Sequence, residues 1–106
     1  MNDVIKWIRM INGIDNASYA AKLLGVSQAY MSMLESGARI VTTEILDKIA
    51  YVYKIESSMI IYIAEAYEQG LCNRLEVMKI IIDYYTYKNN QKYLDDEIKT
   101  KDMKEI

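Results

Sequence analysis

The chain has 106 residues, which is the size of one compact domain or of a small domain with an appendage. Hydrophobic residues make up 52% of it, enough for a buried core, and the absence of proline with only four glycines favours helices. One cysteine, Cys72, excludes an internal disulfide and a cysteine-ligated zinc site.

Charge is unevenly distributed along the sequence. The formal net charge is -2, whereas nucleic-acid-binding proteins are usually basic. Residues 1–55 carry six Lys/Arg against five Asp/Glu, a net of +1, and residues 56–106 carry seven against ten, a net of -3. If the protein contacts phosphate groups, we therefore expect the first half to do so.

The first two predicted helices are short. In residues 3–12, apolar residues recur at helical spacing, and Gly13 ends this segment. Asn16 is a good N-cap residue for a second helix over 17–24. The first segment has an apolar stripe, formed by Val4, Ile8 and Ile11 and widened by Ile5 and Trp7, and the second is expected to end at Gly25.

A tight turn separates the second predicted helix from the third. Gly25 ends the second helix, and Ser27 is placed to cap a third over 28–36, which Gly37 ends. Two short helices joined by a turn that contains glycine have the spacing of a helix-turn-helix.

Two further helices follow a short loop. Thr42 can cap a fourth helix over 43–53, whose apolar positions fall on one face. Ser57 or Ser58 can cap a fifth over 59–69. The sequence is thus predicted to be helical well beyond the helix-turn-helix.

The last predicted helix begins with a capping pattern. Asn73 and Glu76 have the spacing of a capping box at the start of a sixth helix over 74–88. Residues 89–106 are rich in charge, and two alternatives are open for them: a frayed helix or a disordered tail.

Residues 16–50 resemble the Cro/C1-type helix-turn-helix, also called the XRE family. The resemblance covers a small residue between the two central helices, the turn, the core of the third helix, its E-x-G ending, the following loop and an L-x-K-I-A motif. The residues that carry it are Ala21, Gly25, Val26, Met31, Leu34, Glu35, Gly37, Arg39, Leu46, Lys48, Ile49 and Ala50. The resemblance implies an all-α fold, with a five-helix, lambda repressor-like DNA-binding domain followed by a C-terminal helical hairpin.

The resemblance also implies a mode of DNA recognition. In this class the third helix lies in the major groove, and polar side chains and helix N-termini hold phosphates. The expected base contacts are Gln28, Ala29, Ser32 and Met33. The expected phosphate contacts are Asn16, Ser27, Tyr30, Arg39 and Thr42. For Asn16, Ser27 and Thr42, helix capping alone is an equally good explanation.

The sequence departs from the family pattern at three places. The segment 28–36 contains no Lys or Arg. Ala17 stands where many family members have a glutamine that contacts phosphate, and Met10 replaces an arginine that often pairs with the glutamate at Glu35. Because Arg9 is one position away, and so about 100° around the helix, we expect Glu35 to lack a partner.

The second half is expected to form an interface. The helix over 74–88 is apolar around most of its circumference, so one stripe should pack within the chain and another on a second chain, although a single compact fold could bury both. The expected interface residues are Leu75, Met78, Ile81, Ile82, Tyr84 and Tyr85. A symmetric dimer would place two recognition helices about 34 Å apart, one turn of DNA. The layout is weakly similar to that of Sin-type regulators.

These features define the expected organisation and function. We expect a Cro/C1-type domain over 1–56, a C-terminal oligomerisation hairpin over 57–88 whose first helix can complete that domain, and a charged tail over 89–106. The expected function is a transcriptional regulator, a repressor, that binds double-stranded operator DNA as a homodimer or as a heteromer with a related helix-turn-helix regulator. The alternative is a protein-binding antagonist that sequesters such a repressor through its C-terminal helices.

Other functions are not expected. The chain has no histidine, the commonest general base, and no phosphate-cradling glycine loop, so we do not expect an enzyme or a small-molecule substrate. The clustered carboxylates Asp95, Asp96 and Glu97 are expected to be solvated, and neither a metal nor a cofactor is predicted. No secretory signal and no apolar run of membrane-spanning length is found, so a cytoplasmic location away from membranes is expected.

Overall fold

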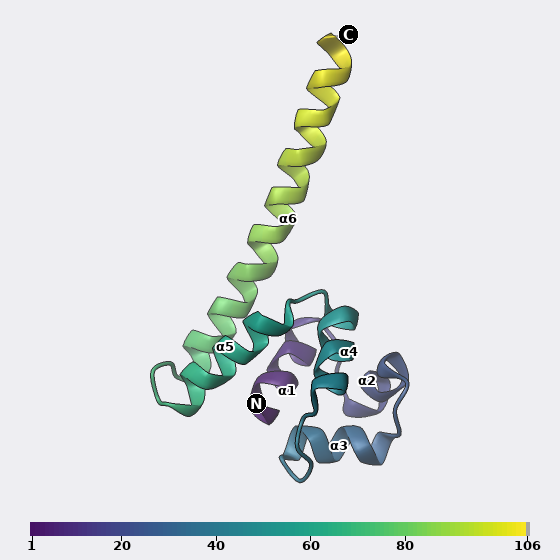
Figure 1. Cartoon of the computed structure of the whole chain (residues 1–106), viewed down its shortest axis with the longest axis vertical. Helices are drawn as coiled ribbons and strands as arrows, with labels where there is room; N and C mark the ends of the chain where they lie inside the picture. The colour runs from purple at the N-terminus through teal and green to yellow at the C-terminus, as the bar shows by residue number, and fades with distance from the viewer. Residues whose placement is uncertain (106) are drawn as a thin grey trace.

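The computed structural model describes the backbone of residues 1–105 and the side chains of residues 1–91. This part of the chain is all-helical, as predicted, with no strand (Figure 1). Its helices are α1 (Asn2–Ile11), α2 (Ala17–Leu24), α3 (Gln28–Ser36), α4 (Thr43–Tyr53), α5 (Ser57–Glu68) and α6 (Arg74–Glu105).

The predicted caps of α2, α3 and α4 are present. The side chain of Asn16 accepts a hydrogen bond from the backbone N–H of Tyr19 (2.8 Å), that of Ser27 from Tyr30 (3.1 Å), and that of Thr42 from Ile45 (3.3 Å). Each bond satisfies a backbone donor that has no partner within its helix.

The start of α5 was predicted wrongly. The helix begins at Ser57, after Glu56, and no side chain caps it. The Ser57 hydroxyl instead donates to an Asp47 carboxylate oxygen (3.0 Å), a contact that ties α5 to α4.

The capping box at the start of α6 is confirmed. The Asn73 side chain accepts from the backbone N–H of Glu76 (2.9 Å), and the Glu76 carboxylate accepts from that of Asn73 (3.2 Å). For residues 89–105 the structure has helix rather than a disordered tail, because α6 continues without a break to Glu105.

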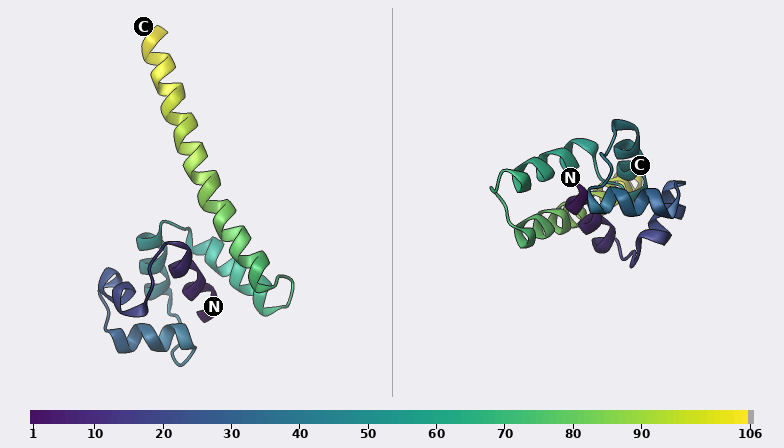
Figure 2. Two further views of the ribbon diagram at one scale, coloured as in Figure 1. Left: turned by 180° about the vertical axis from the view of Figure 1, so that it is seen from behind. Right: turned by 90° about the horizontal axis from the view of Figure 1, so that it is seen from below.

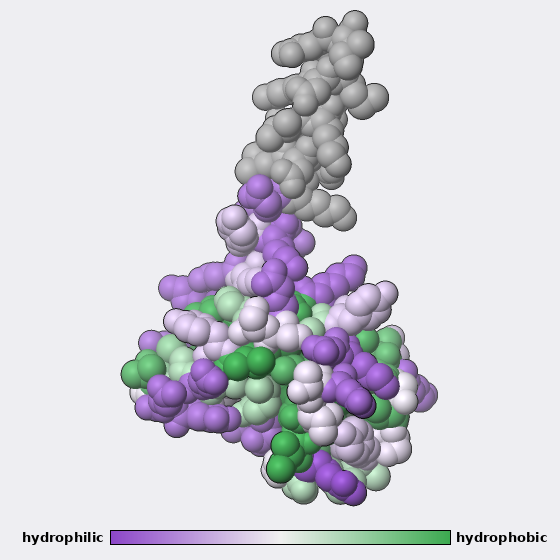
Figure 3. Space-filling model, viewed as in Figure 1, coloured by the Kyte–Doolittle hydropathy of each residue, from purple (hydrophilic) through white to green (hydrophobic). Residues whose placement is uncertain are grey.

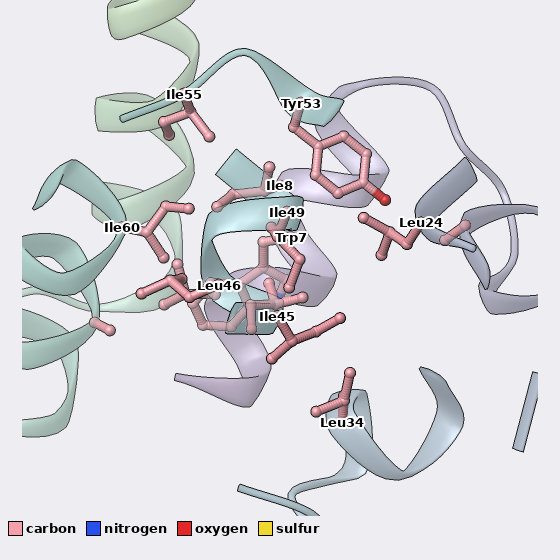
Figure 4. Close-up of a cluster of buried hydrophobic side chains, with 14 of the residues drawn as sticks. Trp7, Ile8, Leu24, Leu34, Ile45, Leu46, Ile49, Tyr53, Ile55 and Ile60 are labelled. Atoms are coloured by element: carbon pink, nitrogen blue, oxygen red, sulfur yellow. The ribbon is translucent and has the colours of Figure 1, made fainter. Parts of the chain in front are cut away.

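A single core joins the elements, with α3 running across the bottom of the domain in the view of Figure 1 and α2 packed against it beside α4. Buried residues from all six helices form one cluster, including Ile8 of α1, Ile49 of α4, Ile60 of α5 and Ile81 of α6. Figure 4 shows part of this cluster around Ile8, Ile49 and Trp7. The helices predicted as a C-terminal hairpin thus share their core with the helices that precede them.

The long helix α6 leaves the domain on the side opposite α3. Its first turns pack on α1 and α5, while its C-terminal part extends past the domain, which gives the molecule a longest dimension of 58 Å (Figure 1; Figure 2, left). None of the helices in residues 1–105 is both long enough and apolar enough to cross a membrane.

Candidate nucleic-acid interface

The turn between α2 and α3 is built as the sequence predicts. Gly25 has φ +70°, a left-handed conformation that glycine adopts without steric cost. Ala20 and Ala21 are buried where the two helices approach each other, and Met31 and Leu34 are the buried side of α3. This packing determines which residues of α3 face outward.

The outward face of α3 carries the predicted base contacts. Gln28, Ala29 and Ser32 are exposed, while Met33 is half-buried. Successive members of the series Gln28, Ser32 and Ser36 are four residues apart, so they follow one line along the helix. Three small or polar side chains at the free face therefore leave room for a base edge to approach.

A buried ion pair holds the C-terminal end of α3 against α1. The Arg9 guanidinium donates to both carboxylate oxygens of Glu35, with N–O distances of 3.0 to 3.1 Å, and the two side chains are only 7% and 8% exposed. Arg9 also donates to the carbonyl oxygen of Ile14 (2.6 Å), and the Asn2 side chain donates to that of Glu35 (3.2 Å).

The expectation that Glu35 lacks a partner was therefore wrong. A rotation of about 100° from the family's arginine position does displace the Cα–Cβ direction, but the arginine side chain is long enough to span the difference. Its planar fork then meets the carboxylate with several parallel hydrogen bonds. The position of Arg9 on the helix alone did not predict its contact with Glu35, because that contact also depends on the length of the arginine side chain.

The predicted phosphate contacts lie at the edges of α3. Asn16 and Ser27 are exposed at the N-termini of α2 and α3, and Thr42 is exposed at the N-terminus of α4. Tyr30 is half-buried, and Arg39 is exposed in the loop after α3. The capping bonds of the three polar residues leave lone pairs on the same oxygens, and the adjacent helix N-termini favour an anion.

Two lysines that were not predicted as contacts flank α3. Lys6 of α1 lines a shallow depression together with Ser32 and Ser36. Lys48 of α4 lines another with Tyr30, Thr42 and Glu44. The spacing along the sequence could not place Lys6 beside α3, because that proximity depends on how α1 packs.

The interface residues predicted on α6 separate into two groups. Leu75 and Ile82 are exposed, at 77% and 48%, and Met78 between them is half-buried. Ile81 is fully buried in the chain's own core, so its predicted place in a dimer interface was wrong. Ile81 belongs with Val77 to the stripe that packs inward, because α1 and α5 both contact this side of α6.

Tyr84 and Tyr85 attach α6 to the junction between α4 and α5. The Tyr85 hydroxyl donates to the carbonyl oxygen of Tyr53 (2.5 Å) and accepts from the Asn12 side chain (3.2 Å). The Tyr84 hydroxyl accepts from the backbone N–H of Glu56 (3.3 Å). Burial raises the pKa of Tyr85, so its hydroxyl keeps its proton to higher pH than an exposed tyrosine does.

One family matches the chain. A family model described as Helix-turn-helix, HTH_3, matches residues 5–59, just over half of the sequence. The chain belongs to this XRE-type helix-turn-helix family. It is accordingly a DNA-binding transcription regulator, and the resemblance to the Cro/C1 type is confirmed. Searches of curated proteins and of solved structures found no match.

The matched region ends inside α5. It covers α1 from Ile5 onward, the whole of α2, α3 and α4, and the first turn of α5, and it excludes α6. The family match therefore gives no information on the role of α6 in this HTH_3 protein.

Proposed function

We propose that this HTH_3 protein is a repressor that binds operator DNA as a dimer and reads bases with the outer face of α3. The observation that supports the proposal is that α3 is held in place by a buried ion pair while its outer face is exposed to solvent. The buried Arg9–Glu35 pair holds α3 against α1, while Gln28, Ala29 and Ser32 are exposed. A recognition helix must be rigid, because base contacts depend on the orientation of each side chain.

The chemistry of this face supports base recognition. The Gln28 side chain can form a bidentate pair with adenine, in which its NH2 group donates to N7 and its carbonyl oxygen accepts from the N6 amino group, and the Ser32 hydroxyl can donate or accept. Ala29 and Met33 are apolar and suit the methyl group of thymine. Asn16, Ser27, Tyr30, Arg39 and Thr42, with Lys6 and Lys48 beside them, would hold the backbone on either side.

The dimer would use the outer stripe of α6. Leu75, Met78 and Ile82 follow one line at spacings of three and four residues. Tyr85 comes next on this line and Tyr84 lies at its edge, but the hydroxyls of both are already bonded within the chain, so they could add only their ring edges to an interface. Leu75 and Ile82 are exposed in the isolated chain, and burying such side chains is worth about 1.5–3 kcal/mol each. A Sin-type arrangement, with C-terminal helices that pair, is part of this proposal.

The second candidate is an antagonist that sequesters a related regulator. It is favoured by the neutral surface of α3, because its only charged residue, Glu35, is neutralised by Arg9. A DNA interface with few cations gains little from counterion release. In this alternative the same stripe on α6 would bind the related chain.

Selection of genomic DNA fragments by the purified protein separates the two candidates. At about 50 mM salt we expect enrichment of a palindromic site, and Gln28→Ala with Ser32→Ala should weaken its binding by about 10- to 100-fold. The matched control is Gln69→Ala with Ser58→Ala, the same substitutions at exposed positions of α5 and its C-terminus. A folded protein that enriches no site would overturn the repressor and favour the antagonist.

A further inference from the structure

A groove lies where α6 leaves the domain. It is formed by the C-terminal ends of α1 and α4 and by the fourth and fifth turns of α6, and its volume is about 720 Å³. The residues that line it are Asn12, Val52, Tyr53, Lys54, Tyr85, Tyr87, Lys88, Asn89 and Gln91. The C-terminal end of α4 and the part of α6 where it leaves the domain lie on the side opposite α3 (Figure 1), so the groove that they line is separate from the candidate DNA interface.

The lining combines aromatic surface with convergent polar groups. Val52, Tyr85 and Tyr87 offer apolar area, while Asn12, Asn89 and Gln91 offer amides. Small-molecule sites are commonly concave, of about 300–1,000 Å³, with a few polar groups in an apolar wall. The size and composition of this groove are within that description.

Two lysines bring positive charge to the groove although the chain as a whole is negative. Lys54 and Lys88 both line it, and none of the Asp or Glu side chains described in residues 1–91 does. Lys88 also lies over the Tyr84 ring, 5.1 Å from its centroid, and the Tyr84 hydroxyl raises the pKa of the Lys88 ammonium.

Negative charge also lies close to the groove. Glu56 lines the adjoining depression, which shares Val52, Lys54 and Lys88 with the groove. The C-terminal ends of α1 and α4, which form part of the groove, are each equivalent to about half a negative charge. Among the described side chains, the full charges that line the groove itself are those of Lys54 and Lys88, so an anion would be attracted to the space directly between their ammonium groups.

The backbone at Lys54 is a second unusual feature. Lys54 has φ +55° and is the only residue other than glycine with positive φ in the described chain. Residues other than glycine, asparagine and aspartate rarely adopt this backbone conformation. Lys54 lines both the groove and the adjoining depression.

We infer that this groove binds a small organic anion with a flat apolar body, such as an aromatic carboxylate. Its ring would lie against Tyr85, Tyr87 and Val52, and its carboxylate would lie between the ammonium groups of Lys54 and Lys88. The ligand would bridge α4 and α6, so it would hold α6 in a fixed orientation relative to the helix-turn-helix.

Titration of the full-length, ¹⁵N-labelled protein with indole-3-acetate tests this inference. We expect saturable shifts of backbone amides in residues 52–54 and 85–91, with half-saturation below about 10 mM. The uncharged indole-3-acetamide should bind at least about 10-fold more weakly, because it lacks the carboxylate.

Three variants show whether the lysines are responsible. Lys54→Gln with Lys88→Gln should weaken binding of indole-3-acetate at least about 10-fold, and Glu56→Gln should strengthen it, because a repelling carboxylate is gone. The matched control is Lys22→Gln with Lys79→Gln, which removes the same charge from exposed positions outside the groove and should leave binding unchanged within about twofold.

Three results would overturn the inference. One is the absence of saturable shifts in the folded protein. Another is equal weakening by the groove pair and by the control pair, which would indicate a general effect of charge. The third is a shift of the groove amides with protein concentration alone, since a second copy of the chain would then occupy the groove.

Discussion

At the scale of single residues, the Arg9–Glu35 pair is the polar contact on which the position of α3 depends. Both side chains are almost fully buried, and Arg9 makes a further bond to the carbonyl oxygen of Ile14. Taking two charges out of water costs free energy that only good geometry and additional hydrogen bonds repay. Here several parallel bonds are present, so removal of one partner should be far worse than removal of both.

Arg9→Met is expected to lower the free energy of unfolding by about 3–5 kcal/mol, because it leaves the Glu35 carboxylate buried without a partner. The double variant Arg9→Met with Glu35→Met should recover part of this loss. Urea unfolding measures both. Arg39→Met is the control, because Arg39 is exposed and its substitution should cost less than about 0.5 kcal/mol. If Arg9→Met were as mild as this control, the buried pair would not be important for stability.

Tyr53 gives a prediction about pH. It is 3% exposed, and its hydroxyl has no hydrogen-bond partner among the described side chains; in Figure 4 it points toward Leu24. Burial, and next the nearby Glu35, raise the pKa of Tyr53 from 10.0 to about 12. The folded state therefore keeps the proton to higher pH than the unfolded state.

Because the pKa of Tyr53 is raised in the folded state, the contribution of its protonated hydroxyl to the free energy of unfolding is fully present below pH 10. That contribution is lost as pH rises from 10 to about 12. We expect Tyr53→Phe, which removes both the unpartnered hydroxyl and the ionisation, to be at least as stable as the wild type at pH 8, and its advantage over the wild type to grow by about 1 kcal/mol near pH 11. Tyr51→Phe is the control, because Tyr51 is 86% exposed. A constant difference between Tyr53→Phe and the wild type across this range would contradict the assignment.

At the scale of helices, the caps of α2, α3 and α4 have two candidate roles. Asn16, Ser27 and Thr42 each satisfy a backbone N–H of their own helix, and each also lies at the edge of the candidate DNA interface. A substitution that keeps the cap while changing the charge separates the roles.

Asn16→Asp is such a substitution. Aspartate caps a helix as well as asparagine does, so thermal unfolding should be nearly unchanged, while Asn16→Ala should cost about 1 kcal/mol. If Asn16 lies beside a phosphate, the added negative charge should weaken DNA binding measured by fluorescence anisotropy, more than Asn16→Ala does. Unchanged DNA affinity of the aspartate variant would leave Asn16 with capping alone.

At the scale of the whole molecule, the direction of α6 relative to α3 constrains how two copies can pair. The long helix leaves the domain on the side away from α3 (Figures 1 and 2). A two-fold axis along the projecting helices would therefore direct both α3 helices toward the same side, as a palindromic site requires. In the view of Figure 3, apolar residues reach the surface of the domain in patches between hydrophilic ones, while the described part of the projecting helix is mostly hydrophilic.

Leu75→Glu with Ile82→Glu tests this pairing. Because both side chains are exposed in the isolated chain, the fold should be retained, whereas charges in the interface should convert the dimer to a monomer and weaken binding to a palindromic site. Sedimentation velocity measures the mass. The control is Tyr51→Glu, at an exposed position of α4. A wild type that is itself monomeric at high concentration would contradict the dimer, as would a variant that keeps the wild-type mass.

The sequence by itself determined the local structure and the family. Capping residues, glycines in left-handed turns and helical periodicity act within a few residues of each other, so Asn16, Gly25 and the Asn73–Glu76 box could be identified without coordinates. The core of α3, with Met31 and Leu34, followed from the same periodicity, and so did the exposure of Gln28 and Ser32.

The tertiary structure alone decided which distant residues meet. That Arg9 reaches Glu35, that Lys6 lies beside Ser32, and that Ile81 faces inward while Ile82 does not, all depend on how α1 and α6 pack. The groove at Lys54 and Lys88 also depends on tertiary packing, since the residues that line it come from three helices far apart in the sequence. Such contacts are set by the docking of whole helices and by the reach of long side chains, and periodicity within one helix carries no information about either.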